Sequence, residues 1–134
     1  ERVDDGLLEL LAGIRLRPVL VIHANHPREI DASVCAALKR LAAAGVILLN
    51  QSVLLRGVNH VAATLAELSE ALFVAQVMPY YLHLLDRVRG AAHFEVKEAE
   101  ASVIMRMLRR QLPGYLVPRL VREQPGQPAK TLIG

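Results

Sequence analysis

The sequence predicts an α/β fold in which parallel βα units form a half (β/α) barrel. Short, continuous apolar runs indicate strands at 19–22, 46–49 and 80–84, with a fourth, bent by Pro118, beginning at 115–117. Such unalternated runs are typical of parallel strands that are buried on both faces. The runs recur roughly every 30 residues with helical patterns between them, as in βα units. We therefore expect right-handed crossovers between consecutive strands.

The intervals between these runs carry apolar residues every three or four positions, which predicts helices. The patterns cover 30–41, 61–72 and 101–112, and a shorter one over 3–11 opens the chain. Asp31 is a helix-start residue, and Gly45 and Gly114 stand where the second and the last helix should end. The segment 122–134, rich in proline and glycine, is expected to be an extended tail of a single domain covering 1–134.

The composition indicates a folded domain with more apolar surface than a small single domain can bury. Of the 134 residues, 53% are hydrophobic and 22% charged, which excludes disorder. A half barrel also has open strand edges, and such edges invite pairing with another copy. We therefore expect a homodimer or a higher oligomer.

Charge, aromatic content and cysteine use narrow the function classes. The net charge of +3 is mild and only 4% of residues are aromatic, so nucleic-acid binding is not expected. No apolar run is long enough for a membrane span, and the acidic start is unlike a signal peptide. Cys35, the single cysteine, falls within a helical pattern and is expected to be a buried, inert thiol. A cytoplasmic location is expected.

Histidines gather where the predicted strands end. His23 ends the first strand, His60 lies in the loop after the second, and His83 and Asp86 close the third. In βα folds the loops after the strands form the functional face. Because imidazole and carboxylate are ligands of zinc, His23, His60, His83 and Asp86 could hold one zinc ion or another divalent metal ion. His60 and Asp86 would then be the catalytic residues, with His26 and His93 as reserve ligands.

A plainer interpretation of the same residues stays open. His23 and His83 could simply form hydrogen bonds in a polar rim, and His26-Pro27 is typical of a turn that begins a helix. No compact metal motif such as H-E-x-x-H occurs.

Three segments together resemble the C-terminal half of the lysine 2,3-aminomutase family. They are His-Ala-Asn-His-Pro at 23–27, Asn-Gln-Ser-Val-Leu-Leu-Arg-Gly-Val-Asn at 50–59, and Pro-Tyr-Tyr at 79–81 with Asp86 and His93-Phe94; Gly-Gln-Pro-Ala-Lys-Thr at 126–131 adds a fourth. The branch that serves modification of elongation factor P is the more similar one. The resemblance extends from Pro18 onward and implies radical S-adenosylmethionine chemistry with pyridoxal phosphate.

The resemblance also implies roles for single residues. Lys130 matches the lysine that binds pyridoxal phosphate covalently, and Asp86 matches an acid that holds the distal ammonium of the substrate lysine. Glu123 stands where the family places a second such acid, usually Asp. Gln51 and His23 match positions that contact S-adenosylmethionine.

Two departures from the family pattern change the functional expectation. The CxxxCxxC motif that binds the [4Fe–4S] cluster belongs to the family's N-terminal half, and this chain has one cysteine. The cluster is therefore not possible within these residues, and the radical reaction is not expected of the chain alone. The family also has Asp after Asn59, where this chain has His60, an additional imidazole on the loop face.

Two functions of different class follow from this reasoning. We expect a small metal-dependent hydrolase of activated phosphate or carboxylate esters, in which the metal activates water. The alternative is a catalytically inert scaffold or assembly fragment of a lysine aminomutase. A weak pyridoxal phosphate binder through Lys130 is a third possibility, but Lys130 is expected not to hold the cofactor stably because the phosphate site is missing.

Overall fold

The computed structural model describes residues 4–12, 17–85, 92–122 and 131–133. Its α-helices are α1 (Asp5–Ala12), α2 (Ala32–Ala43), α3 (Ala62–Val74) and α4 (Glu98–Gln111). Its strands are β1 (Val19–Ile22), β2 (Ile47–Leu54), β3 (Met78–Leu84), β4 (Arg119–Arg122) and β5 (Thr131–Leu132). Short 3-10 helices are η1 (Pro27–Glu29), η3 (Ala92–Phe94) and η4 (Gly114–Leu116).

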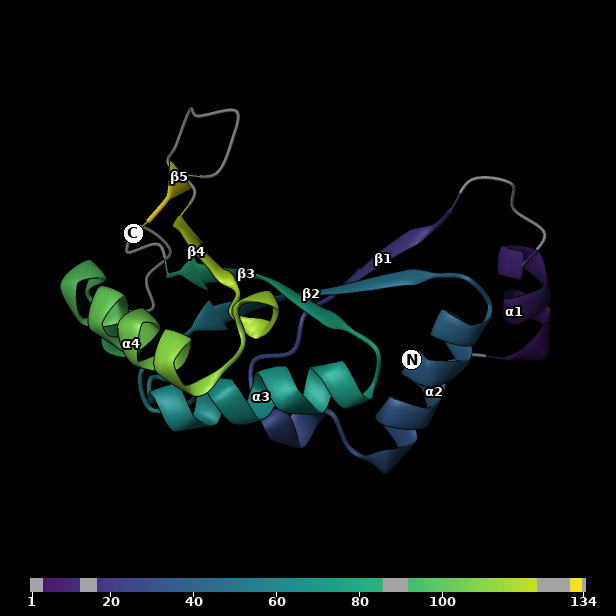
Figure 1. Ribbon diagram of the computed structural model, residues 1–134, viewed down its shortest axis with the longest axis horizontal. Coiled ribbons are helices and arrows are strands. Elements are labelled where there is room, and N and C mark those ends of the chain that lie inside the picture. The colour runs from purple at the N-terminus through teal and green to yellow at the C-terminus, as the bar shows by residue number, and fades with distance from the viewer. Residues whose placement is uncertain (1–3, 13–16, 86–91, 123–130, 134) are drawn as a thin grey trace.

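The strands form one sheet in the order β1-β2-β3-β4-β5. The first four are parallel, and β5 joins β4 in the antiparallel sense. Helices α2, α3 and α4 lie along one side of the sheet, and the other side is open (Figure 1). A row of parallel strands with helices on one face only is the wall of a (β/α) barrel, so the predicted half barrel is confirmed.

The core lies between the helices and the sheet, in two clusters that share α3. One cluster joins α3 to α4 and includes Leu54, Leu65, Leu82 and Leu108. The other joins α2 to α3 and β2 and includes Leu38, Leu41, Leu48, Leu68 and Leu72. Helix α3 therefore packs against both neighbouring helices, which ties the βα units into one body.

The helix predictions hold, with small differences at the ends. Asp31 caps α2 by accepting a hydrogen bond from the Val34 amide, and Gly45, with φ of +93°, follows the helix in the left-handed region that glycine favours. Helix α4 begins at Glu98, three residues before the predicted start.

Two strand predictions need correction. The apolar run over 46–49 continues to Leu54, since Asn50 and Ser52 face the helices, where both are buried. The strand predicted at 115–117 is wrong, because Leu116 and Val117 donate amide hydrogen bonds to Pro113 and Gly114 and so close η4. Strand β4 begins only after Pro118, whose nitrogen carries no hydrogen for a sheet bond.

The predicted extended tail is described only in part. Within it, Thr131–Leu132 forms β5, so this part of the tail is a strand rather than a loop. Among the described residues, no helix is both long enough and apolar enough to cross a membrane.

Candidate functional site

Strand β2 divides its side chains strictly between the two faces of the sheet. Leu48, Asn50, Ser52 and Leu54 point to the helices and are 4% exposed or less. The alternate residues, including Gln51 and Val53, point to the open face and are partly exposed. The Asn50–Asn59 motif therefore contributes one polar side chain from β2, that of Gln51, to the open face.

Three asparagines join the carboxyl ends of β1 and β2. The Asn50 side chain exchanges two hydrogen bonds with the backbone of Ala24, at 2.8 and 3.1 Å. The Asn59 amide donates to the carbonyls of Asn25 and Val53 and accepts from the Leu55 amide, all within 2.9 Å. The Asn25 side chain in turn accepts from the Val53 amide. Because these bonds satisfy buried backbone groups, the asparagines fix the loops at this edge of the sheet.

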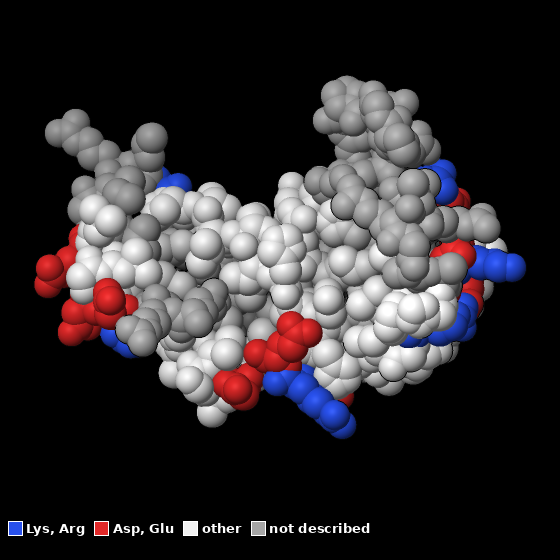
Figure 2. Space-filling model, turned by 180° about the vertical axis from the view of Figure 1, so that it is seen from behind, with Lys and Arg blue, Asp and Glu red and all other residues white. Residues whose placement is uncertain are grey.

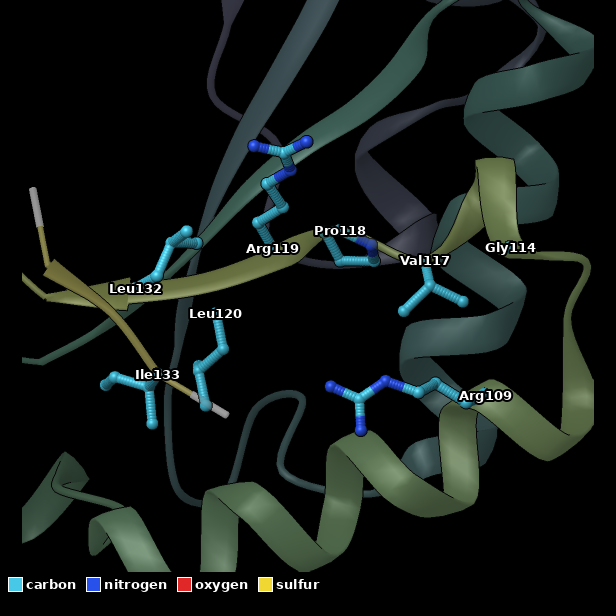
Figure 3. Close-up of a pocket in the computed structure, with 8 residues that line it drawn as sticks. All are labelled: Arg109, Gly114, Val117, Pro118, Arg119, Leu120, Leu132 and Ile133. Atoms are coloured by element: carbon cyan, nitrogen blue, oxygen red, sulfur yellow. The ribbon is translucent and has the colours of Figure 1, made fainter.

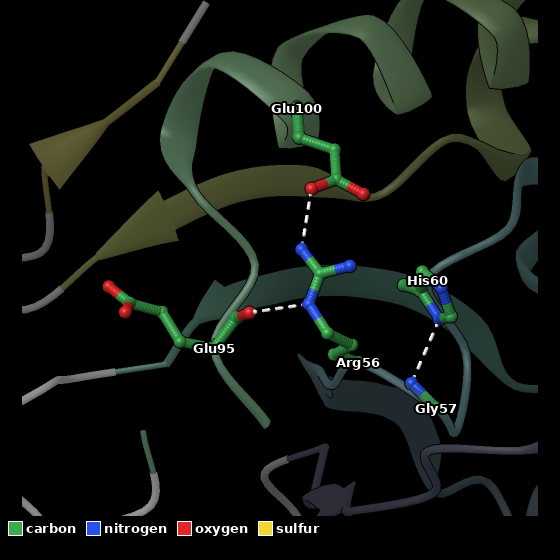
Figure 4. Close-up of polar contacts among 5 residues, drawn as sticks. All are labelled: Arg56, Gly57, His60, Glu95 and Glu100. Carbon is green, nitrogen blue, oxygen red and sulfur yellow. Dashed lines mark hydrogen bonds and ion pairs between the residues drawn. The ribbon is translucent and has the colours of Figure 1, made fainter. Parts of the chain in front are cut away.

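Arg56 connects the loop after β2 to the segment that precedes α4 (Figure 4). Its Nε donates to the Glu95 carbonyl at 3.0 Å, and its guanidinium pairs with the Glu100 carboxylate at 2.6 Å. Its backbone amide donates to the Phe94 carbonyl. Gly57 follows with φ of +82°, which suits a residue without a Cβ. These contacts hold together the loops at the carboxyl ends of two neighbouring strands.

A polar pair lies on the open face between β2 and β3. The His83 Nε2 and the Gln51 Oε1 are 2.9 Å apart. Since a carbonyl oxygen only accepts, the ring nitrogen donates, and the amide nitrogen of Gln51 is turned away from the ring. Tyr81, paired with Gln51 in the sheet register, has its ring edge-on to His83 at 5.9 Å. Among the described residues, the Gln51 amide nitrogen has no hydrogen-bond partner, so it offers two N–H donors to the open face.

The register between β2 and β3 shifts next to this pair. Asn50 is opposite Pro79, whereas Gln51 is opposite Tyr81, so Tyr80 is the extra residue of a bulge. The rings of Tyr80 and Tyr81 lie with their centroids 4.0 Å apart and are tilted by 30° to each other. Bulges of this kind re-aim side chains and are frequent beside binding sites.

The histidines lie on different elements of the structure and make different contacts. His26 accepts a hydrogen bond at Nδ1 from the Arg28 amide and so caps η1. His60 likewise accepts one at Nδ1 from the Gly57 amide, at 2.9 Å (Figure 4). His83 lies within β3, next to its last residue, as the sequence predicted. His23 follows β1 and His93 lies on η3, both exposed.

The predicted zinc site gains no support. Within residues 4–12, 17–85, 92–122 and 131–133, no group of three or more His, Cys, Asp or Glu side chains could hold a metal ion. Asp86, Glu123 and Lys130 lie outside the described residues. Three of the histidines make other contacts: His26 and His60 each accept a hydrogen bond within their own turn, and His83 pairs with Gln51.

The sequence analysis missed the asparagines, Arg56 and Tyr81. The asparagines could have been recognised from the sequence, since Asn25, Asn50 and Asn59 are polar residues that follow or interrupt the apolar strand sequences. No local pattern could reveal the pairing of Arg56 with Glu100, which joins residues 44 positions apart.

The outer surface shows where charge gathers (Figure 2). Acidic side chains predominate at the end formed by α1, basic and acidic side chains both lie at the end formed by α4, and the described surface bordering the hollow between the two ends is mainly uncharged. A separate cavity of about 410 Å³ lies beside α4, lined by Arg109, by Arg119 and by mainly apolar residues of β4, β5 and the segments next to them (Figure 3).

The chain is similar in sequence to several known proteins that share one name. The chain is 55% identical over 130 residues to the L-lysine 2,3-aminomutase of Escherichia coli, which covers 97% of this chain and 38% of that protein. It is 51% identical to the enzyme of Haemophilus influenzae and 39% identical to that of Clostridium subterminale, covering 39% and 32% of their lengths. No model of a protein family matches the sequence.

A solved structure supports the fold. A radical SAM methyltransferase from Sphaerobacter thermophilus superposes with a TM-score of 0.63 over 89% of this chain and 38% of that one, at 18% identity. This likeness shows a shared architecture. The family follows from the relatives above: the chain belongs to the L-lysine 2,3-aminomutase family and spans less than two fifths of the length of the relatives described.

Proposed function

We propose that this chain forms one wall of a lysine 2,3-aminomutase-type barrel and is catalytically incomplete by itself. The observation that carries the proposal is the 55% identity to the Escherichia coli enzyme along 97% of the chain, against 38% of that enzyme's length. The other residues of a barrel must then come from sequence outside these 134 residues. This proposal replaces the ester hydrolase, which neither the fold nor the relatives support.

The residues present do not fit an iron–sulfur cluster. Such clusters need several thiolates, and the chain has only Cys35. That thiol lies on α2, packed against the core cluster of α2 and α3, on the helix-covered side of the sheet. The cluster of a complete family member would therefore be held elsewhere.

The open face does fit part of a polar nucleoside ligand. Gln51 offers two N–H donors there, and Tyr81 offers an aromatic ring beside them. We propose that Gln51 donates to an acceptor atom of S-adenosylmethionine and that His83 holds the amide in the orientation that this requires. When bound, S-adenosylmethionine supplies the radical chemistry of the family. His23, exposed after β1, is the second proposed contact.

Substrate and pyridoxal phosphate would meet residues beyond the described ranges. By family resemblance, Lys130 would bind pyridoxal phosphate, and Asp86 and Glu123 would bind the distal ammonium of L-lysine. Arg56 supports this proposal indirectly, because it anchors η3 and the start of α4, which follow the 86–91 segment, to the loop after β2.

A hybrid enzyme tests the proposal. The segment of the Escherichia coli enzyme that matches this chain is replaced by the chain, and conversion of L-lysine to its 3-amino isomer is measured. We expect the hybrid to be active and the isolated 134-residue chain to be inactive. A folded, cluster-loaded hybrid without activity would overturn the proposal.

Binding measured by calorimetry tests the role of Gln51 separately from turnover. In the hybrid, Gln51→Leu should weaken S-adenosylmethionine binding about tenfold, which is the usual cost of losing a hydrogen bond to a ligand. His83→Phe should cause a smaller loss, since the amide remains but is no longer oriented. Gln111→Leu, at an exposed position of α4, is the matched control and should change nothing.

A further inference from the structure

A cavity of about 410 Å³ lies between the end of α4 and strands β4 and β5 (Figure 3). Its walls are mainly apolar, formed by Val117, Leu120, Leu132 and Ile133. Leu120 and Ile133 are buried, whereas Leu132 is 61% exposed. The part of the cavity that receives the Arg109 side chain is on the helix-covered side of the sheet, since Leu120 and Ile133 belong to the cluster of α3 and α4, whereas Leu132 extends to the same side as Arg119 (Figure 3). It is therefore separate from the open face discussed above.

Arg109 provides the polar group of this cavity. Its guanidinium extends from α4 into the space below Val117 and Leu120, whereas the side chain of Arg119 extends to the other side of β4 (Figure 3). Among the described residues, Arg109 has no hydrogen-bond or ion-pair partner, and no acidic residue lines the cavity. Arg56 and Arg122, in contrast, are paired with Glu100 and Glu98.

We propose that this cavity binds a carboxylate carried on an apolar body. A guanidinium recognises a carboxylate through two parallel N–H donors, and the apolar walls would accept an alkyl chain or a leucine side chain. The same chemistry is presented by a free medium-chain carboxylate and by the C-terminal carboxylate of a polypeptide that ends in leucine.

The first experiment identifies the site. Octanoate is added to the 134-residue chain labelled with nitrogen-15, and backbone amide shifts are followed by NMR. We expect saturable shifts at Arg109, Val117–Leu120 and Leu132–Ile133, with a dissociation constant of about 1 mM, as suits a ligand of this size. Shifts confined to the open face, or no shifts at 10 mM octanoate, would overturn the proposal.

Matched substitutions then test the role of Arg109. Arg109→Gln should weaken octanoate binding about fivefold, as expected for a partly exposed ion pair. Arg110→Gln removes the same charge from the neighbouring exposed position, which does not line the cavity, and should leave affinity unchanged. Equal losses in the two variants would show a general charge effect and contradict the proposal.

Two further ligands separate the contribution of the charge from that of the alkyl chain, and distinguish a free carboxylate from the end of a polypeptide. Octanamide, which lacks the negative charge, should bind wild type and Arg109→Gln equally weakly. A short peptide ending in leucine with a free carboxylate is compared with its C-terminal amide. Preference for the free peptide over octanoate would identify a polypeptide as the natural ligand, and the reverse would identify a free carboxylate. If octanamide binds as tightly as octanoate, the assignment of Arg109 fails.

Discussion

The two faces of the sheet are built from the same strands but differ in completeness. On the helix-covered face, β2 presents Leu48, Asn50, Ser52 and Leu54, all almost inaccessible to solvent. On the open face, the same strand presents Ile47, which is 38% exposed, and residues such as Gln51 and Val53 that are half-buried. One face is buried in the core, and the other is a surface with polar donors and exposed apolar area.

This difference between the two faces is present within a single motif. In the part of the Asn50–Asn59 segment that belongs to β2, which ends at Leu54, alternate residues lie on opposite faces because side chains alternate along a strand. The asparagines at its two ends are used in backbone hydrogen bonds, whereas Gln51 faces the open side, where we propose that it binds a ligand. The following predictions test that division, from the largest expected effect to the smallest.

Truncation on the two faces should have unequal costs. Leu54→Ala, at a fully buried position, should lower the free energy of unfolding by about 3 kcal/mol, because it leaves a cavity in the core. Val53→Ala, on the open face, should cost about 1 kcal/mol. Urea unfolding followed by circular dichroism at low protein concentration measures both. Equal losses would mean that the open face is covered in solution.

Loss of the Asn59 side chain should be almost as costly. Asn59→Ala removes three hydrogen bonds and leaves partly buried backbone groups of Asn25, Val53 and Leu55 without this partner, so we expect the free energy of unfolding to fall by about 2–3 kcal/mol. Asn25→Ala removes one side-chain bond and should cost about 1 kcal/mol. Similar values for the two variants would argue against the asparagine network.

Removal of the Arg56 contacts should have a smaller effect. Arg56→Met should cost about 1 kcal/mol, since the side chain is 41% exposed and solvent weakens its ion pair with Glu100. Arg122→Met, which breaks the pair with Glu98, should cost less than about 1 kcal/mol, because it removes no bond to a backbone carbonyl. If 1 M salt abolished the whole effect at Arg56, the bond to the Glu95 carbonyl would be unimportant.

The edge of the sheet at β1 should control self-association with little effect on stability. Val19, 54% exposed, begins β1, whose outer edge has no neighbouring strand among the described residues. We expect sedimentation to show a dimer or higher oligomer for wild type and a shift toward monomer for Val19→Lys, because a charged edge resists pairing. Val103→Lys, on the exposed side of α4, is the control and should associate as wild type does. A monomeric wild type would refute the oligomer prediction.

Metal removal should have the smallest effect. The described residues contain no group of three metal-ligating side chains, so a chelator should change the melting temperature by less than about 1 °C. Thermal unfolding with and without EDTA measures this. A clear fall, lost in His60→Ala, would restore the metal site.

The fold was largely predictable because its signals are local. Apolar runs and helical spacing located three of the four parallel strands and every α-helix. The fourth strand was misplaced by a few residues, since η4 depends on Pro113 and Gly114 accepting bonds that no hydrophobic pattern encodes. The candidate site was predicted less well, because histidine spacing says nothing about which atoms meet.

The sequence by itself determined the α/β class, the order of the helices and strands, and the family, since these follow from periodicity and from a long specific motif. Only the tertiary structure decided the use of the polar residues. It assigned His26 and His60 to local caps, Asn50 and Asn59 to loop closure, and Gln51 with His83 to the open face. The physical reason is that a hydrogen bond between distant residues depends on strand register, and register exists only when the strands are packed together.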